Sequence, residues 1–101
     1  MKNTIRVSNV IGSSICVAVE DGQKLFDVLS QAMAKNNQLE LSFDGIDLII
    51  PAFLNVAIGQ LYGTFSEETI ANVLSYTHLE DNDKALLELV IANALRYYNT
   101  N

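Results

Sequence analysis

The sequence contains few of the residue types on which many functional sites depend. It has one cysteine, one histidine and no tryptophan. A disulfide framework needs paired cysteines, and a structural zinc site needs four Cys or His ligands, so we expect neither a disulfide nor a metal. Cys16 lies in an apolar run between Ile15 and Val17. We interpret it as a buried strand residue rather than a reactive thiol, because nothing basic stands next to it.

Basic residues are also scarce. The chain has 6 Lys and Arg against 12 Asp and Glu, which gives a formal net charge of −6. The positive residues are scattered along the sequence. Nucleic-acid binding depends on Lys and Arg that neutralise phosphates, so we expect no nucleic-acid partner. The acidity is typical of a small apolar-rich domain that stays in solution.

Long hydrophobic runs are missing. No apolar stretch approaches the roughly 18 residues of a membrane-spanning helix. The first ten residues, MKNTIRVSNV, have no apolar core of signal-peptide length. We therefore expect a cytoplasmic protein with no membrane partner. At 101 residues, half of them hydrophobic, the chain has the length and composition of one folded domain, residues 1–101.

The stretch from Leu39 to Leu61 is the predicted centre of the fold. Residues 39–43 alternate between apolar and polar side chains, which is the period of a half-buried strand. Asp44-Gly45 predicts a turn, and a second apolar run reaches Pro51, which suits the first position of a helix. Residues 52–61 then have helical apolar spacing. A strand that leads through a loop into a helix is a common place for a binding site in α/β proteins.

Two short β-prone segments precede this unit. Residues 4–10 and 15–19 flank a turn cluster at 11–14, and together they predict an N-terminal β-hairpin. Glu20-Asp21-Gly22 ends the second strand, with Asp21 as the predicted N-cap. Residues 23–34 then form an amphipathic helix with a clear apolar face.

The C-terminal part contains two further helices and a strand. Thr64 and Glu67 have capping-box spacing, which predicts a short helix over residues 65–71. Residues 73–77 favour a strand, with a helix that continues through Leu74 as the alternative. The last helix, residues 83–98, is apolar nearly all round. It either carries a partner or self-association surface, or lies deep against the sheet with its two tyrosines at the edge.

The predicted order is therefore β-β-α-β-α-(α)-β-α, in the α/β class. Strands that alternate with helices indicate a partly parallel sheet with right-handed crossovers. Three or four helices against four strands make either a two-layer sandwich or a sheet with helices on both faces.

Several of these segments resemble the STAS-like family, in particular a small bacterial group of STAS-like proteins of unknown function. The resemblance extends from about Val10 to Leu95. It is carried by the predicted hairpin, by the helix that opens at Glu20-Asp21-Gly22, by the strand and turn LSFDGID, and by the helix entry Ile50-Pro51-Ala52-Phe53. Phe65-Ser66-Glu67-Glu68, followed by a strand and a last helix, also fits.

The resemblance implies a mixed sheet of four to five strands packed with three to four helices. It also implies a regulatory signalling role, because STAS domains include anti-anti-sigma factors that bind a histidine-kinase-like ATPase. That partner phosphorylates a Ser or Thr at the start of the helix after the central strand. Here Pro51 and Ala52 stand at the matching positions, and no Ser or Thr occurs between Gly45 and Gly63. Phosphorylation at the usual place is therefore not expected.

The first hypothesis is a non-enzymatic module that binds another protein and needs no cofactor. The candidate partner is a histidine-kinase-like ATPase. The residues expected to line the docking edge share the loop and helix entry after the central strand: Asp44, Asp47, Pro51, Ala52 and Asn55. Two alternatives remain open. The apolar last helix would suit a self-associating scaffold or homodimer. A small hydrolase would need a deep pocket that joins His78 to Asp44 or Asp47.

Overall fold

Three parallel strands form the main sheet of the computed structural model, which describes residues 3–35 and 38–98. They are β1 (Asn3–Arg6), β3 (Leu39–Ser42) and β5 (Leu74–Thr77), in the order β1-β3-β5. Both pairs are parallel and in continuous register, so that Ile5, Leu41 and Tyr76 stand in one row across the sheet. Leu41 belongs to the buried core, and Ile5 and Tyr76 are partly buried and pack against it.

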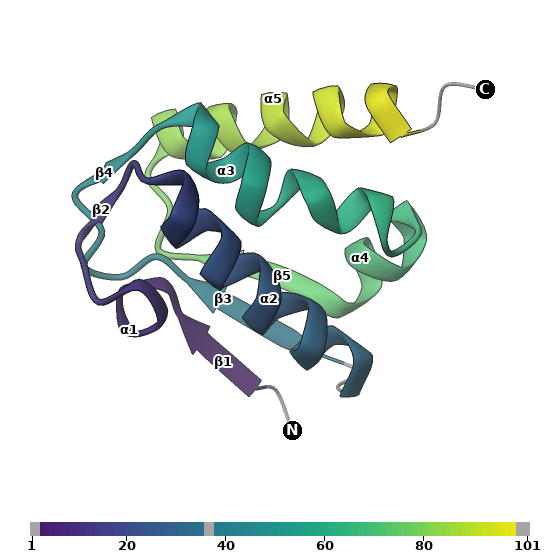
Figure 1. Cartoon of the computed structure of the whole chain (residues 1–101), viewed down its shortest axis with the longest axis horizontal. Helices are drawn as coiled ribbons and strands as arrows, with labels where there is room; N and C mark the ends of the chain where they lie inside the picture. The colour runs from purple at the N-terminus through teal and green to yellow at the C-terminus, as the bar shows by residue number, and fades with distance from the viewer. Residues whose placement is uncertain (1–2, 36–37, 99–101) are drawn as a thin grey trace.

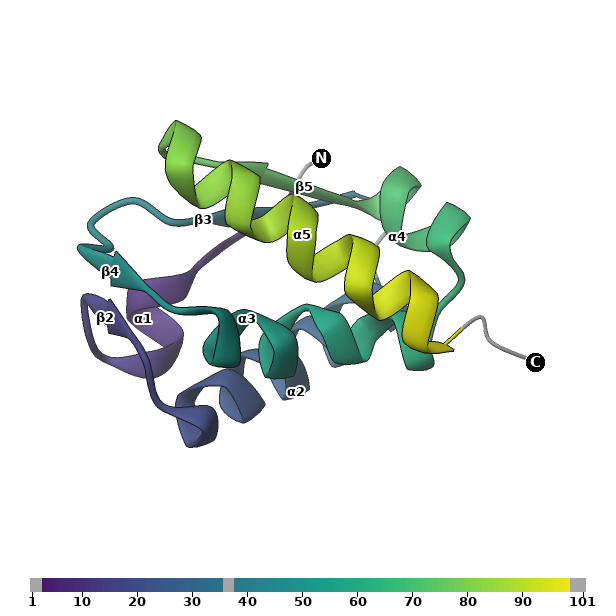
Figure 2. The same cartoon turned by 90° about the horizontal axis from the view of Figure 1, so that it is seen from above.

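The helices cover only one side of this sheet. Helix α2 (Val19–Lys35) packs against α3 (Pro51–Ala57), and α5 (Asp81–Tyr98) packs against α3 and the 3₁₀ helix η1 (Gly59–Gly63). Figures 1 and 2 show α2, α3 and α5 together on one side, with β3 and β5 behind them. The fold is thus the two-layer alternative, not a sheet with helices on both faces.

The uncovered face of the sheet is polar. Thr4, Glu40 and Ser75 form a row across the three strands, each one position before a core residue. Parallel sheets usually have both faces covered. The alternation of polar and apolar residues along these strands allows this sheet to keep one face in water.

A second, two-stranded parallel ladder lies at one end of the molecule. It joins β2 (Ile15–Cys16) to β4 (Leu48–Ile49), with Ile15 opposite Leu48 and Cys16 opposite Ile49. The family resemblance implied one mixed sheet of four to five strands. That expectation is wrong in arrangement, because the described strands pair only in parallel and form two separate sheets.

The predicted N-terminal hairpin is also wrong. β1 ends at Arg6, and residues Val7–Ile11 form a short helix, α1, because Val7 and Ile11 are four residues apart and both are buried. Gly12 ends this helix at a φ of 69°, where its N–H donates to the carbonyl of Ser8. The strands on either side of α1 pair with β3 and β4 instead of with each other.

Helix α2 begins four residues earlier than predicted, at Val19, so Asp21 lies within its first turn and is not its N-cap. Gly22 is a packing residue. A Cβ atom at this position would lie 2.9 Å from the Phe53 carbonyl oxygen and 3.1 Å from the Val56 Cβ. The missing side chain lets α2 and α3 approach closely.

The central unit from Leu39 to Leu61 is largely confirmed. Strand β3 is followed by the turn at Asp44-Gly45, where Gly45 has a φ of 81°. Pro51 then stands at the start of α3, as predicted. The helix is shorter than expected, since it ends at Ala57 and the chain continues as η1.

In the C-terminal part, the strand at 74–77 is confirmed and the helical alternative is wrong. The preceding helix α4 (Glu67–Val73) is capped by Ser66 and not by Thr64, because the Ser66 side chain accepts a hydrogen bond from the Thr69 N–H. Helix α5 starts at Asp81 and buries only one face, through Leu87, Val90 and Ala94. It packs on α3 and η1 rather than deep against the sheet.

Candidate functional site

An open hollow of about 340 Å³ lies at the carboxyl ends of β3 and β5. This is the end of a parallel sheet at which α/β proteins commonly bind their ligands. Its lining comes from two loops, one after each strand, and from the start of α5. The lining residues are 43–46, Ile49, 78–80 and Asp83.

An ion pair connects the end of β1 to the turn after β3. The Arg6 guanidinium at the end of β1 lies 3.2 Å from the Asp44 carboxylate and donates a hydrogen bond to it. Both side chains are about half exposed, at 47% and 54%, so the pair contributes well under about 1 kcal/mol to stability. The pair therefore adds little to stability, but it means that the Asp44 carboxylate already has a partner.

His78 is held to the same turn from the other loop. Its Nδ1 lies 3.3 Å from the Ser42 Oγ, and that oxygen also accepts a hydrogen bond from the Asp44 N–H at 3.2 Å. His78 has a φ of 59°, the only positive φ of a non-glycine residue in the described part of the chain. Left-handed backbone at such a residue costs roughly 1 kcal/mol and indicates a position that its surroundings determine.

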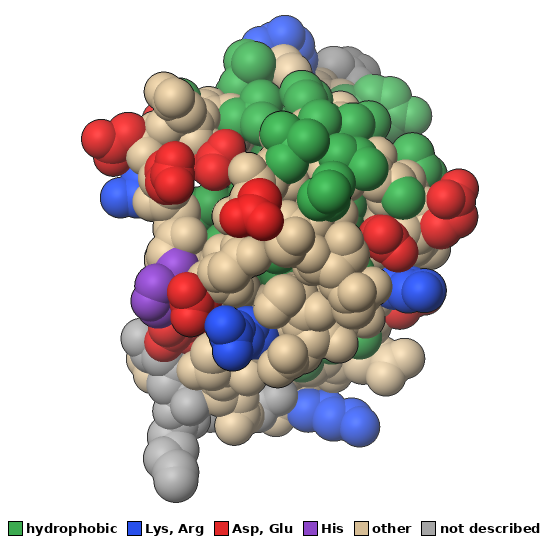
Figure 3. Space-filling view, turned by 90° about the vertical axis from the view of Figure 1, so that its left-hand side faces the viewer, with side chains coloured by type: hydrophobic (Ala, Val, Ile, Leu, Met, Phe, Trp, Pro, Cys, Tyr) green, Lys and Arg blue, Asp and Glu red, His purple; other side chains and the backbone are tan. Residues whose placement is uncertain are grey.

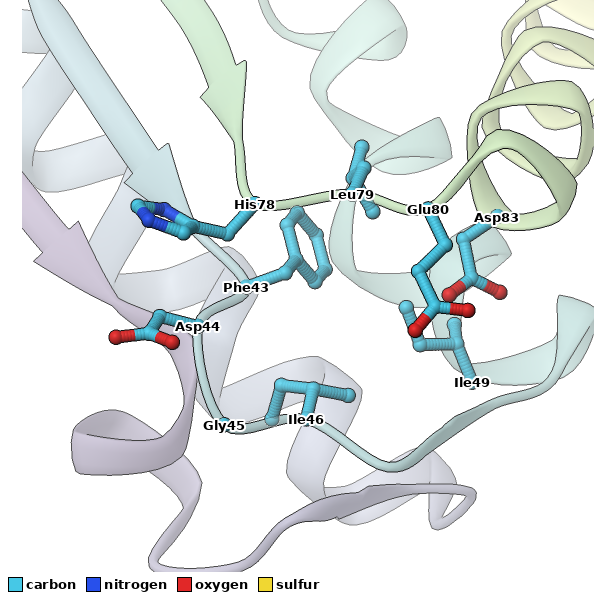
Figure 4. A pocket seen from close by; sticks show the side chains of 9 residues that line it. All are labelled: Phe43, Asp44, Gly45, Ile46, Ile49, His78, Leu79, Glu80 and Asp83. Carbon is cyan, nitrogen blue, oxygen red and sulfur yellow. The ribbon is translucent and has the colours of Figure 1, made fainter.

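Figure 4 shows how the polar side chains divide around Phe43. His78 and Asp44 point to one side of the Phe43 ring, and Glu80 and Asp83 lie on the other side near Ile49. Phe43 and Ile49 are 2% and 7% exposed, so they form an apolar floor. The hollow thus combines an apolar base with carboxylates at its edge, and no Lys or Arg lines it.

The hollow brings His78 and Asp44 together, but it is open and not the deep pocket that the hydrolase alternative required. The contacts within it do not form a nucleophile with a base and an orienting acid. Asp44 pairs with Arg6, and the Ser42 hydroxyl that contacts His78 belongs to a residue that is only 5% exposed. A nucleophile must reach its substrate, so buried Ser42 is poorly placed for that role.

The five residues predicted for docking are all exposed, but they do not share one depression. Asp44 lies at the hollow after β3, whereas Asn55 lines a second hollow of about 290 Å³ between α3 and α5. Asp47 lies on the loop before β4, where its N–H donates to the Ser14 carbonyl. Pro51 and Ala52 form the entry of α3. The structure thus distributes the five residues over the turn after β3, the loop before β4 and helix α3, and does not bring them together in one pocket.

Sequence reasoning missed Arg6 and Ser42. Both stand at the last position of their strands and are register partners. The alternation in residues 39–43 placed Ser42 on the polar face of its strand, but only the pairing of β3 with β1 and β5 brings it next to Arg6 and His78. No local pattern in the sequence indicates these contacts.

Cys16 is buried, as predicted. Burial, with smaller contributions from the charges of Asp21 and Asp83, raises the pKa of its thiol to about 12. The thiol therefore stays protonated and unreactive at neutral pH. Within residues 3–35 and 38–98, no three His, Cys, Asp or Glu side chains are grouped so that they could hold a metal ion.

A comparison with protein families shows the family to which this chain belongs. Residues 21–84 match the family model of the STAS-like domain of unknown function (DUF4325), which is more than half of the chain. The chain belongs to this STAS-like family. The match includes the turn after β3, the entry of α3 and every residue that lines the hollow. No curated protein and no solved structure matches the chain.

The helices within the described residues were also compared with the requirements of a membrane span. None of them is both long and apolar enough to cross a bilayer.

Proposed function

We propose that this STAS-like domain is a non-enzymatic regulatory module that binds another protein through the edge formed by the β3–β4 loop and the entry of α3. The observation that carries the proposal is the exposure of Asp47, Pro51 and Ala52 at that edge, next to exposed apolar side chains of the β2–β4 ladder. Exposed apolar surface with a polar margin is typical of protein-interaction sites. A histidine-kinase-like ATPase is the partner class to test first, in the cytoplasm.

The docking edge acts without a phosphorylation switch at the helix entry. Pro51 and Ala52 have no hydroxyl group, and residues 46–62 contain no Ser or Thr. A partner ATPase would therefore bind this edge without changing its charge. Regulation then depends on the amount or availability of either protein rather than on phosphate at this loop.

The test is capture of a purified histidine-kinase-like ATPase by the tagged full chain and by two matched variants. Ala52→Arg places a bulky charged side chain at the α3 entry, and Ala34→Arg places the same side chain on the exposed surface of α2. We expect the wild type and Ala34→Arg to retain the partner and Ala52→Arg to lose it. Equal retention by both variants would refute the docking edge.

A self-associating scaffold is the second candidate. Its support is the outer surface of α5, where Leu89 is 57% exposed and Tyr97 is 74% exposed. Light scattering over a hundredfold concentration range would show a rising mass that Leu89→Glu abolishes. A constant monomer mass would exclude it.

A hydrolase is the alternative that we do not favour, because Ser42 is buried. Ester hydrolysis that disappears in both Ser42→Ala and His78→Ala, with the fold intact by circular dichroism, would overturn the non-enzymatic proposal.

A further inference from the structure

Four exposed apolar side chains gather at the end of the molecule that carries the β2–β4 ladder. Ile15 and Leu48 are register partners and are 44% and 50% exposed, whereas their neighbours Cys16 and Ile49 are buried. Val17 and Val19 follow β2 and are 38% and 50% exposed. Figure 3 shows hydrophobic side chains collected over this end, with acidic side chains around them. We refer to Ile15, Val17, Val19 and Leu48 as the apolar patch.

The margin of the apolar patch is mainly acidic. Glu20 and Asp47 are exposed and are the chain neighbours of Val19 and Leu48. Asp21 and Asp83 lie close enough to Cys16, between Ile15 and Val17, to affect its thiol. Lys24 lies 3.9 Å from Asp21 and offsets that one charge in part. The patch therefore combines apolar surface with a negative field.

The patch adjoins the hollow through β4. Leu48 is part of the patch, and the next residue, Ile49, lies in the floor of the hollow. In Figure 4 the carboxylates of Glu80 and Asp83 lie beside Ile49. An apolar floor under paired carboxylates fits a side chain with an aliphatic stem and a positive end, as Lys and Arg have.

Charge also argues against a second copy of this chain as the occupant. The chain has a net charge of −6, and a symmetric contact through the patch would bring two acidic margins together. A partner of opposite charge is attracted to the same surface and associates faster.

We propose that the apolar patch and the adjoining hollow bind a basic amphipathic segment of the partner protein. Its apolar side chains cover Ile15 and Leu48, and a Lys or Arg enters the hollow beside Glu80 and Asp83. The inference rests on the proposed function, because this segment belongs to the protein that docks at the α3 entry.

The test uses a synthetic 14-residue peptide with Leu and Lys at amphipathic helical spacing, titrated into the ¹⁵N-labelled full chain. Two further peptides serve as probes: one with Glu in place of Lys, and one with the same Leu and Lys in scrambled order. We expect the first peptide to shift the amide signals of residues 15–19, 46–49 and 78–83. We expect the Glu peptide not to bind and the scrambled peptide to bind at least tenfold more weakly.

Two matched variants locate the contact. Leu48→Asn should weaken binding about tenfold, because it removes exposed apolar area that the peptide would cover. Leu89→Asn makes the same change on exposed α5 and should leave the Kd unchanged. Glu80→Gln should weaken binding and make it less sensitive to salt. Circular dichroism confirms that each variant is folded.

Three outcomes would each overturn the inference. The first is an equal Kd for Leu48→Asn and Leu89→Asn, and the second is equal binding of the ordered and scrambled peptides. The third is a concentration-dependent dimer of this chain that Leu48→Asn dissociates. The ATPase capture experiment keeps the two proposals separate. If Ala52→Arg abolishes capture while the peptide fails to bind, the docking edge stands and the basic segment does not. If the peptide binds as described and the Ala52→Arg variant still captures the ATPase, the proposed function fails instead.

Discussion

The Nδ1 of His78 lies 3.3 Å from the Oγ of Ser42, and this contact joins the loop after β5 to the end of β3. The same Ser42 oxygen accepts a hydrogen bond from the Asp44 N–H at 3.2 Å, so it contacts the loop after β3 as well. The left-handed backbone of His78, with a φ of 59°, carries the ring to this position. One buried hydroxyl thus ties both loops of the hollow together.

This geometry predicts an unusual order of stability among variants of His78. His78→Ala and His78→Gly both lose the contact with Ser42, but only alanine keeps the steric cost of a positive φ. We expect His78→Gly to be more stable than His78→Ala by about 1 kcal/mol, even though glycine gains freedom in the unfolded chain. Urea unfolding of both variants measures the difference. Equal stabilities, or a more stable alanine variant, would show that residue 78 is not held in this conformation.

The contact of α2 with α3 predicts a second effect. Gly22→Ala places a Cβ atom 2.9 Å from the Phe53 carbonyl oxygen, which belongs to the backbone and cannot move aside easily. Overpacking of this kind costs about 1–3 kcal/mol, more than the gain of about 1 kcal/mol in helix propensity. These ranges give a net loss of up to about 2 kcal/mol, and we expect a value of about 1 kcal/mol in thermal or urea unfolding.

Gln31→Ala is the matched control, because Gln31 is an exposed residue of the same helix. It should leave the stability within about 0.5 kcal/mol of the wild type. A Gly22→Ala variant as stable as this control would mean that the two helices do not approach as closely as the structure shows.

The parts of the fold predicted correctly are those with a local cause. The β3 strand follows from alternation, the turn from the ability of Gly45 to adopt a φ of 81°, and the start of α3 from the preset φ of Pro51. The buried Cys16 follows from its apolar neighbours. Each of these depends on residues within a few positions of one another.

The wrong predictions concern segments whose structure depends on contacts with residues far away in the sequence. Residues 4–10 alternate loosely, but the burial of Val7 and Ile11 under α2 makes the second half of that segment helical. The sequence pattern favours a turn at Gly22, because the close approach of Phe53, which requires glycine there, is visible only in the folded structure. The candidate site has the same property, since the Arg6–Asp44 and Ser42–His78 contacts join residues 38 and 36 positions apart.

The cap of α4 provides a direct test of one corrected expectation. Ser66 accepts a hydrogen bond from the Thr69 N–H at 3.1 Å, whereas the sequence pattern favoured Thr64. Ser66→Ala should therefore cost about 1 kcal/mol of unfolding free energy, and Thr64→Ala should cost less than about 0.5 kcal/mol. The reverse order would restore Thr64 as the cap.

The buried thiol of Cys16 predicts how stability changes at alkaline pH. Its pKa is raised from 9.0 to about 12, mainly by burial, so the folded protein keeps the proton over a range in which the unfolded chain releases it. Above about pH 9 the unfolded state binds fewer protons at this group, and the free energy of unfolding falls as pH rises towards 12. The fall can reach about 1.4 kcal/mol per pH unit.

Cys16→Ala loses packing at every pH but has no thiol to titrate. Its stability deficit relative to the wild type should therefore shrink by at least about 1 kcal/mol between pH 8 and pH 10.5, measured by urea unfolding. Tyrosine and lysine titrations affect both proteins alike and cancel in this difference. A deficit that stays constant over this range would mean that the thiol titrates equally in the folded and unfolded states, and that Cys16 is not buried.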